Sequence, residues 1–226
     1  MTNGSSHIVI VAGGEEDDEL FLRDVLGQGD FWCADRGYLL CHPLGLMPRL
    51  LIGDLDSVSA EHIEAVRASG GEILRFPPEK NESDLELAVR EAQGRGFTSI
   101  TFVGLAGGRL DHALFNLLAI LGLAQDMGID CRARSSQSEV RLLLPGIHLL
   151  SLTEGALCSL LPLSDTVEDV VLEGLYYPLR GETLHRTSTR GLSNVVTQSQ
   201  VTISLRAGRL LLILPCSGRG VVRQQI

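Results

Sequence analysis

Residues 49–69 read RLLIGDLDSVSAEHIEAVRAS, and this stretch decides the fold class. Its first part, residues 49–53, is a short apolar run ending at a glycine, which is typical of a buried β-strand. Its last part, from Ser59 to Ser69, has the pattern of an α-helix. A strand followed closely by a helix, with Asp54 and Asp56 between them, indicates one unit of a parallel α/β sheet.

The same alternation of strands and helices continues on both sides of this stretch, through the first ~130 residues. Buried strands are predicted for HIVIVAG (7–13), FWCAD (31–35), EILRF (72–76) and SITFVG (99–104). Helices are predicted at Asp17–Gln28, near Tyr38, at Ser83–Gln93 and at Leu110–Gln125. This order predicts a mostly parallel sheet with both faces covered, which binds its ligands beyond the carboxyl ends of the strands.

The character of the sequence changes after Asp130. Residues 131–226 contain short apolar runs, such as EVRLLL (139–144) and RLLLILP (209–215), separated by Gly, Pro, Ser and Thr. Short strands with regular turn signals predict an antiparallel sandwich or a small barrel. The polar segment CRARSSQSE (131–139) has no apolar run. We therefore expect an α/β domain at residues 1–132 and an all-β sandwich domain at residues 133–226.

The charge balance limits the partners of the chain. It has 19 Lys and Arg against 28 Asp and Glu, a formal net charge of −9. Nucleic-acid binding depends on clustered basic residues, so an acidic chain is a poor general binder of nucleic acid. The same acidity disfavours a polyphosphate site unless a divalent cation lies between the carboxylates and the phosphates.

We also expect a reduced, cytoplasmic protein without a membrane segment. The N-terminus lacks the basic region of a signal peptide. The longest mostly apolar segment, Ala113 to Ala124, is well short of the ~20 residues that span a bilayer. The five cysteines are odd in number and form no CxxC pair, which favours free thiols in a reducing compartment.

The strongest local motif is GDLDS at residues 53–57, directly after a predicted strand. Asp54 and Asp56 are two residues apart, so both side chains can point toward the same crevice. Two carboxylates at a strand end suit Mg²⁺, which takes one or two protein carboxylates and completes its shell with water and substrate phosphates. Ordinary turn chemistry is the alternative, because Gly, Asp and Ser are common in turns.

Two further polar loops follow predicted strands. In the first, Lys80 can pair with a phosphate oxygen and Asp84 can serve as a third metal ligand or as a base; helix capping by Ser83 is the alternative. The second loop is GLAGGRLDH (104–112), in which the Arg109 guanidinium can donate two parallel hydrogen bonds to a phosphate. The alternative for His112 in that loop is a partly buried polar side chain whose hydrogen bonds are satisfied within the protein. No GxxxxGK[ST] motif occurs, which excludes a P-loop NTPase.

Taken in order, the motifs resemble the thiamine pyrophosphokinase family. They are ADRG (34–37), GDLDS (53–57), KNESD (80–84), GGRLDHALFN (107–116), GLYYPL (174–179) and GLSN (191–194). The resemblance implies a nucleotide-binding α/β domain that carries catalysis, a β-sandwich domain for thiamine binding and dimerisation, and a homodimer with shared active sites. The implied reaction transfers the diphosphate group of ATP to thiamine, releases AMP and uses Mg²⁺.

The resemblance also implies roles for individual residues. Metal binding falls to Asp54, Asp56 and Asp84, and nucleotide or phosphate binding to Asp35, Lys80, Arg109 and Asp111. Thiamine contacts fall to Tyr177, Ser193 and Asn194. Catalysis is assigned to Asp56, Asp84 and Arg109, and either Asp56 or Asp84 can take the proton of the thiamine hydroxyl.

The chain departs from the family pattern at two positions. Arg36 replaces a glycine that is common in the family, and Tyr177 stands where a tryptophan is frequent. Two other functions remain open: a catalytically silent sensor that binds a nucleotide or thiamine, and a diphosphotransferase for another heterocyclic alcohol.

Overall fold

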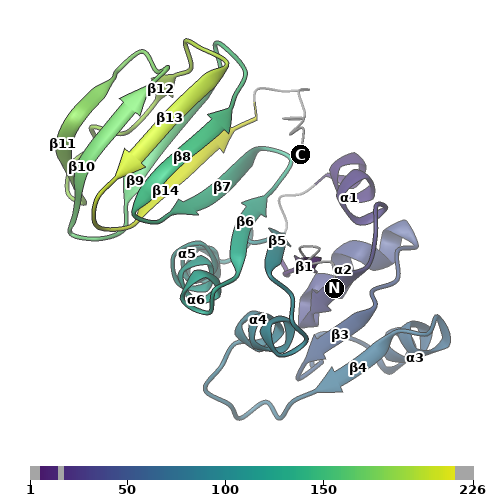
Figure 1. Cartoon of the computed structure of the whole chain (residues 1–226). Helices are drawn as coiled ribbons and strands as arrows, with labels where there is room; N and C mark the ends of the chain where they lie inside the picture. Colours follow the sequence, from purple (N-terminus) through teal and green to yellow (C-terminus); the bar gives the residue numbers. More distant parts are fainter. Residues whose placement is uncertain (1–5, 15–17, 217–226) are drawn as a thin grey trace, which may run out of the picture. The chain divides into compact units, whose positions relative to one another are not determined.

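The structure, a computed structural model, describes residues 6–14 and 18–216. The chain divides into two compact units, Met1–Ser136 and Gln137–Ile226 (Figure 1). Among the described residues, no helix has the length and apolar character needed to cross a membrane.

The N-terminal unit is built on a parallel sheet, as predicted. The strands expected from the sequence are β1 (His7–Val11), β2 (Phe31–Ala34), β3 (Leu50–Gly53), β4 (Glu72–Arg75) and β5 (Ser99–Val103). A further strand, β6 (Asp130–Arg134), pairs in parallel with β5. The order across the sheet is β6-β5-β1-β2-β3-β4. All neighbouring pairs in this order are parallel, so their carboxyl ends lie along one edge.

The helices of this unit also follow the predicted order. They are α1 (Glu19–Leu26), α2 (Tyr38–Cys41), α3 (Ala60–Ala68), α4 (Asp84–Gly94), α5 (Leu110–Phe115) and α6 (Leu121–Asp126). Short 3₁₀ turns lie at η1 (Asp35–Gly37) and η2 (His42–Leu44). The predicted long helix at 110–125 is interrupted by a π-helical turn, η3 (Asn116–Ile120). Asp17, where we expected the first helix to begin, lies outside the described residues.

Apolar side chains cover both faces of the sheet. On one face, Leu22 and Val25 of α1 pack in a cluster with Val11, Phe31 and Cys33 from the strands. On the other side, α4 packs against β2 and β3, and α6 packs against β6. Figure 1 shows α4, α5 and α6 together on that side. This two-sided coverage explains why the strand sequences are nearly continuous apolar runs.

Strand β6 corrects one expectation. We placed the domain boundary after residue 132, in the polar segment at residues 131–139, and β6 runs across that position. Cys131 and Ala133 are buried on one face of the strand, whereas Arg132 and Arg134 lie on the other. Only two small apolar residues alternate with arginines, so the strand lacks the aliphatic signal on which the prediction relied.

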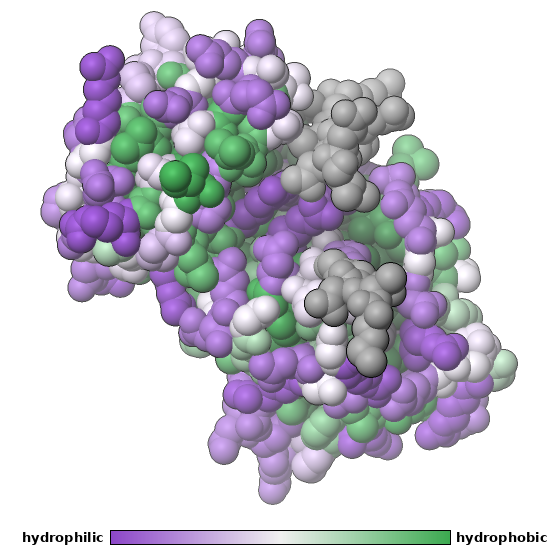
Figure 2. All heavy atoms as spheres, viewed as in Figure 1, coloured by the Kyte–Doolittle hydropathy of each residue, from purple (hydrophilic) through white to green (hydrophobic). Residues whose placement is uncertain are grey.

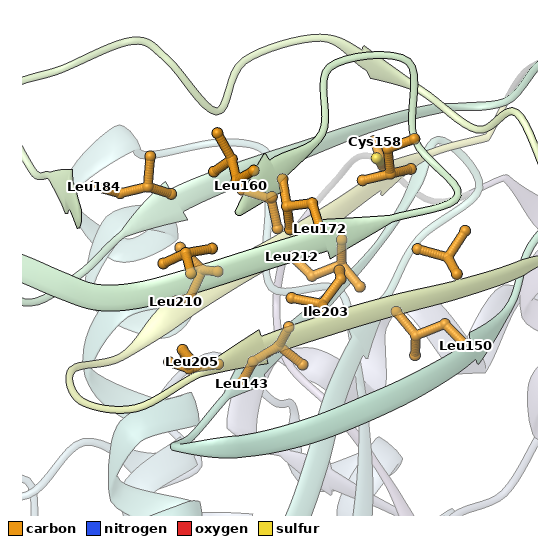
Figure 3. Close-up of a cluster of buried hydrophobic side chains, with 14 of the residues drawn as sticks. Leu143, Leu150, Cys158, Leu160, Leu172, Leu184, Ile203, Leu205, Leu210 and Leu212 are labelled. Atoms are coloured by element: carbon orange, nitrogen blue, oxygen red, sulfur yellow. The ribbon is translucent and has the colours of Figure 1, made fainter. Parts of the chain in front are cut away.

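The C-terminal unit is all-β, as predicted. Its strands are β7 (Ser138–Leu143), β8 (Gly146–Ser151), β9 (Leu157–Pro162), β10 (Thr166–Glu173), β11 (Leu179–His185), β12 (Asn194–Val195), β13 (Gln200–Leu205) and β14 (Leu210–Pro215). They form two antiparallel groups, in the orders β12-β9-β14-β7 and β11-β10-β13-β8. In Figure 3, Leu172 and Ile203 of one group meet Leu160 and Leu212 of the other, which forms a sandwich core.

Some apolar side chains of this unit stay on its surface. Ile147 and Leu149 alternate with inward residues on β8 and are each about three-quarters exposed (74% and 75%). Apolar residues are visible on the surface of the unit in Figure 2. Scattered exposed apolar residues are normal in folded proteins, so these positions carry no conclusion alone.

Candidate active site

Three carboxylates converge at the carboxyl ends of neighbouring strands. Asp35 follows β2, Asp54 follows β3, and Asp84 is the first residue of α4. One oxygen from each side chain lies within 4.8 Å of the others. These residues, here called the acidic cluster, come from three segments that the parallel sheet brings to one edge. A set of three hard oxygen donors is suited to Mg²⁺.

Lys80 supplies a positive charge within the acidic cluster. Its Nζ lies 3.2 Å from Asp54 Oδ2 and 3.1 Å from Asp84 Oδ1. Burial alone would lower the pKa of Lys80, but the bonds to Asp84 and Asp54 outweigh burial and raise it. Burial alone would likewise raise the pKa of Asp54, but hydrogen bonds donated by the Asp56 N–H and by Lys80 outweigh burial and lower it.

The charge of Asp35 is less well compensated than the charges of Asp54 and Asp84, which both contact Lys80. The residue is buried, and its Oδ1 has no hydrogen-bond partner among the described residues. Burial raises the pKa of Asp35 against hydrogen bonds from Ser57 and Arg36, and the charges of Asp84 and Asp54 add to the increase. A buried carboxylate oxygen without a partner, facing two like charges, is a coordination position that a cation would satisfy.

Gly53 makes the convergence of the cluster possible. Its φ is +147°, and a Cβ atom there would lie 3.0 Å from the Asp35 Cβ and 3.0 Å from Asp84 Oδ1. A side chain at this position would crowd Asp35 and Asp84, two of the three carboxylates. The glycine of the GDLDS motif is therefore required by space as well as by backbone conformation.

Asp56 lies next to the cluster and is not one of its three members. Its backbone N–H donates to Asp54 Oδ1 (3.2 Å), and its own carboxylate accepts from the Ser57 hydroxyl (3.1 Å). The residue is exposed. We expected Asp54, Asp56 and Asp84 as the metal group and Asp35 as a nucleotide contact. The structure instead brings Asp35 together with Asp54 and Asp84.

Arg109 and Asp111, at the start of α5, bond to each other. Arg109 donates from Nη2 and Nε to the two Asp111 oxygens, at 2.6 and 3.1 Å. The bond to Arg109 lowers the pKa of Asp111 to about 2. Both side chains are more than half exposed (71% and 55%), so the guanidinium can exchange this partner for an anion from solution.

Arg36, the first departure from the family pattern, packs on the loop after β1. Its Cβ, Cγ and Cδ lie 2.9–3.3 Å from the position that a Cβ on Gly13 would occupy. The aliphatic part of Arg36 thus fills space beside Gly13, in the loop after β1. In the same loop, the Gly14 N–H donates to the Gly104 carbonyl (2.8 Å), which ties the ends of β1 and β5 together.

In the C-terminal unit, Asn194 holds the backbone of Tyr177. Its Nδ2 donates to the Tyr177 carbonyl (2.8 Å), and its Oδ1 accepts from the Tyr177 N–H (2.9 Å). Asn194 is buried, whereas the neighbouring Ser193 is exposed and adopts a left-handed backbone (φ +57°). These three predicted thiamine contacts are thus gathered at one place, with Asn194 bonded to main chain.

The two adjacent tyrosines differ from our expectation. The sequence of residues 172–179 predicts a strand that leads into a turn, with one tyrosine ring packed inward and the other outward. Tyr176 and Tyr177 instead lie in a bend between β10 and β11, and both are exposed (65% and 60%). Their rings meet edge to face with centroids 4.9 Å apart. A bend removes the alternation of a strand, which leaves both rings accessible to a ligand.

The fold and this arrangement define a class of protein. Carboxylates and a lysine at the carboxyl edge of a parallel sheet, in a chain that continues into a β-sandwich, are typical of an enzyme of phosphoryl or diphosphoryl transfer. Comparison with protein families gives the particular one. The family model described as "Thiamin pyrophosphokinase, catalytic domain" matches residues 27–131. The model described as "Thiamin pyrophosphokinase, vitamin B1 binding domain" matches residues 147–210. The chain belongs to the thiamin pyrophosphokinase family.

Individual relatives agree with this assignment. The thiamine pyrophosphokinase of Bacillus subtilis (strain 168) is 28% identical over 211 residues, which cover 91% of this chain and 97% of that protein. A crystal structure of thiamine pyrophosphokinase from Bacillus subtilis matches with a TM-score of 0.82 at 26% identity, covering 94% of this chain and 100% of that chain. A thiamin pyrophosphokinase structure from Geobacillus thermodenitrificans gives a TM-score of 0.80 at 29% identity, covering 93% and 98%.

Proposed function

We propose that this protein transfers the diphosphate group of ATP to the hydroxyl of thiamine, giving thiamine diphosphate and AMP, with Mg²⁺ as the metal. The observation that carries the proposal is the acidic cluster of Asp35, Asp54 and Asp84 around Lys80, in a chain whose two domains both match the family. A chain of net charge −9 needs cations to hold a tetra-anionic donor, and the cluster is suited to bind one.

The residues present fit a magnesium ion. The acidic cluster offers three carboxylate oxygens, and the Asp35 Oδ1 has no other partner among the described residues. When bound, Mg²⁺ would neutralise charge on the phosphates and help to align them. We assign the metal to Asp35, Asp54 and Asp84.

Lys80 and Arg109 would bind the phosphate chain. The Lys80 ammonium lies among the carboxylates, and a phosphate oxygen can replace one of them as its partner. The Arg109 guanidinium is exposed, and its fork geometry matches two phosphate oxygens. Together these cations hold the β-phosphorus of ATP in line with the thiamine hydroxyl, so positioning supplies much of the catalysis.

We assign acceptance of the hydroxyl proton to Asp56. Asp84, the other candidate, already forms an ion pair with Lys80 and belongs to the metal cluster. A carboxylate already held by a cation is less available to approach a substrate hydroxyl. Asp56 lies outside the three-carboxylate cluster and is held beside it by its N–H bond to Asp54.

On the thiamine side, we propose that Tyr177 stacks on the cationic ring system and that Asn194 positions Tyr177. The exposed ring of Tyr177 and the two bonds from Asn194 to its backbone support these roles. Ser193, exposed beside them, offers a hydroxyl to the same ligand.

We further propose a cytoplasmic homodimer with shared sites. The free cysteines of the described residues support a reducing compartment.

A product assay tests the proposed reaction. Purified protein incubated with thiamine, ATP and Mg²⁺ should form AMP and thiamine diphosphate in equal amounts, measured by chromatography. Formation of ADP would contradict diphosphate transfer, and absence of any product would favour a silent sensor. Replacing thiamine with other heterocyclic alcohols tests for a different acceptor.

The metal requirement is tested with the same assay. Excess EDTA should abolish product, and Mg²⁺ should restore it. Asp54→Asn should lower turnover by orders of magnitude without unfolding the protein. Asp165→Asn is the matched control, because Asp165 is an exposed carboxylate paired with Arg186 in the C-terminal unit. Full activity in excess EDTA would contradict the metal assignment.

A further inference from the structure

Arg75 is the last residue of β4 and lies beside the loop that carries Asp54. In the parallel register of β3 and β4, Arg75 pairs with Gly53, the residue directly before Asp54. The two strands are side by side in Figure 1. The Phe76 N–H donates to the Gly53 carbonyl (2.8 Å), which holds the chain after β4 against the end of β3. Arg75 is therefore at the same carboxyl edge of the sheet as the acidic cluster, although none of the family motifs includes it.

The side chain of Arg75 is anchored to the main chain of that loop. Its Nε donates to the Asp54 carbonyl oxygen at 3.2 Å, and the residue is exposed. A guanidinium has five N–H donors, so this bond leaves those of the two Nη groups available to a ligand. The bond also limits the positions that the guanidinium can adopt. Arg75 is thus oriented in advance, beside the carboxylate loop that we assign to the metal.

Within the described part of the chain, no Asp or Glu oxygen lies within 4.0 Å of the Arg75 guanidinium. The other end of β4 is different, because both oxygens of Glu72 accept bonds of 2.8 Å from Arg95. The Asp54 carbonyl is a neutral acceptor, so it orients Arg75 without cancelling its charge. The positive charge of Arg75 therefore remains available to an anion from solution.

The two cations already assigned to the phosphates are, by contrast, both engaged by carboxylates. Lys80 contacts two of them, at 3.2 and 3.1 Å, and Arg109 is bonded to both oxygens of Asp111. Each of these cations must release a carboxylate oxygen when it takes a phosphate oxygen. Arg75 has only water to exchange, and it can keep its bond to the Asp54 carbonyl. A phosphate therefore gains the charge of Arg75 without the loss of an ion pair.

We propose that Arg75 is a third phosphate-binding residue of the nucleotide site, an inference that rests on the proposed function. Its Nη groups donate to phosphate oxygens of ATP while its Nε stays on the Asp54 carbonyl. The planar guanidinium suits phosphate, which accepts paired hydrogen bonds from it. This contact is made equally in the bound substrate and in the transition state, so it lowers KM for ATP and leaves kcat nearly unchanged.

The kinetic test compares Arg75→Gln with the unsubstituted chain, with ATP varied at excess Mg²⁺ and saturating thiamine. KM for ATP should rise by about tenfold, the effect of losing one charge-assisted contact. The kcat and KM for thiamine should change little. Arg67→Gln is the matched control, because Arg67 is an exposed arginine near the end of α3, which leads to the opposite edge of the sheet at the start of β4. It should leave KM for ATP unchanged.

A second measurement separates direct contact from a purely structural role. If Arg75 acted only by holding the Asp54 loop, its loss would also weaken the binding of the metal, because Asp54 belongs to the acidic cluster. The concentration of Mg²⁺ that gives half-maximal activity, measured at saturating ATP, should be unchanged in Arg75→Gln. A rise in this concentration parallel to the rise in KM for ATP would overturn the direct contact.

Calorimetric titration of the full chain with ATP and Mg²⁺, without thiamine, makes the test independent of turnover. Arg75→Gln should weaken ATP binding by about tenfold, and Arg67→Gln should not. This result in a chain that forms no thiamine diphosphate would refute the proposed reaction and support the role of Arg75. Normal product formation with unchanged KM and Kd for ATP in Arg75→Gln would overturn the role of Arg75 and leave the reaction intact. Absence of ATP binding by the unsubstituted chain would overturn both.

Discussion

Asp35, which we propose as a metal ligand, lies in an unfavourable environment for a carboxylate. Its pKa is raised by burial and by the neighbouring Asp84 and Asp54 charges. A carboxyl group with a higher pKa in the folded chain holds its proton more readily when folded. Its ionisation, as the pH rises above its ordinary range near about 4, therefore lowers the free energy of unfolding.

Asp35→Asn should therefore stabilise the metal-free protein while it abolishes turnover. Asn tolerates the positive φ of this position, which is +39°. A gain on the order of 1 kcal/mol corresponds to about 2–4 °C in Tm for a chain of this size. Thermal unfolding in EDTA at pH 7 measures it, and the gain should shrink toward pH 4. Asp165→Asn is the control, and a lower Tm for Asp35→Asn would contradict the interpretation.

Individual site residues were only partly predictable from the sequence. Lys80 and Asp84 could be proposed because each follows a strand, and the structure brings them together with Asp54. Membership of Asp35 in the acidic cluster depends on a left-handed backbone after β2 and on the space beside Gly53. Neither feature has a pattern in the sequence. The spacing of Asp54 and Asp56 favoured Asp56 as a metal ligand, whereas the structure groups Asp35 with Asp54 and Asp84 and leads us to propose Asp35 for that role.

The N-terminus of α4 links helix stability to the site. Ser83 accepts the Glu86 N–H (3.1 Å) as the helix N-cap, and Asp84 is the next residue. Ser83→Ala should lower stability by about 1 kcal/mol, and it should also raise KM for ATP, because the first turn that carries Asp84 frays. Thermal unfolding and steady-state kinetics measure the two effects.

Ser59→Ala is the matched control for this prediction. Ser59 caps α3 in the same way, accepting the His62 N–H (3.3 Å), and α3 carries no residue of the acidic cluster. It should lose similar stability with unchanged KM. Equal kinetic effects in both variants would mean that the cap of α4 does not position Asp84.

The bend between β10 and β11 presents Tyr177 to a ligand. Tyr177→Ala should raise KM for thiamine by about 2- to 30-fold, the range of a cation–π contact of roughly 0.5–2 kcal/mol. KM for ATP and Tm should change little, because the ring is exposed. Steady-state kinetics with each substrate varied in turn measures this. Tyr176→Ala is the control, and an equal effect there would exclude a specific role for Tyr177.

Most strands and helices of the N-terminal unit followed from their apolar periodicity. The exceptions were elements whose residues are unusual for their type. Strand β6 places Arg132 and Arg134 on one face, so it resembled a polar linker. The tyrosine pair resembled part of a strand, although Gly174 and Pro178 on either side favour a bend. For β6, tertiary context overrode the local pattern. For the tyrosine pair, the flanking glycine and proline were the more informative local signal.

The proposed homodimer with shared sites predicts the activity of dimers that combine two different variant chains. The acidic cluster belongs to the N-terminal unit and Tyr177 to the C-terminal unit. If a site takes its cluster from one chain and its tyrosine from the partner subunit, Asp54→Asn and Tyr177→Ala chains complement each other. Randomly mixed dimers should then recover about one quarter of wild-type activity at limiting thiamine, since half of the dimers have one intact site.

Activity after co-refolding equal amounts of the two variants measures this recovery. Each variant refolded alone is the baseline. Activity no greater than the mean of the two baselines, in heterodimers demonstrated by mass spectrometry, would mean that each site is built within one chain.

The ammonium group of Lys80 lies between Asp54 and Asp84. Its position affects how the protein folds and the order in which its ligands bind. Because the chain carries this counter-ion covalently, newly synthesised protein can fold without waiting for a metal ion. If a metal ion binds at the acidic cluster, as we propose, an ion that arrives without a nucleotide must compete with the Lys80 ammonium for Asp54 and Asp84. A nucleotide that arrives with its metal gives the lysine a new partner in the same step. We therefore expect the metal ion and the nucleotide to bind together. Lys80 would thus determine the order in which the two ligands bind.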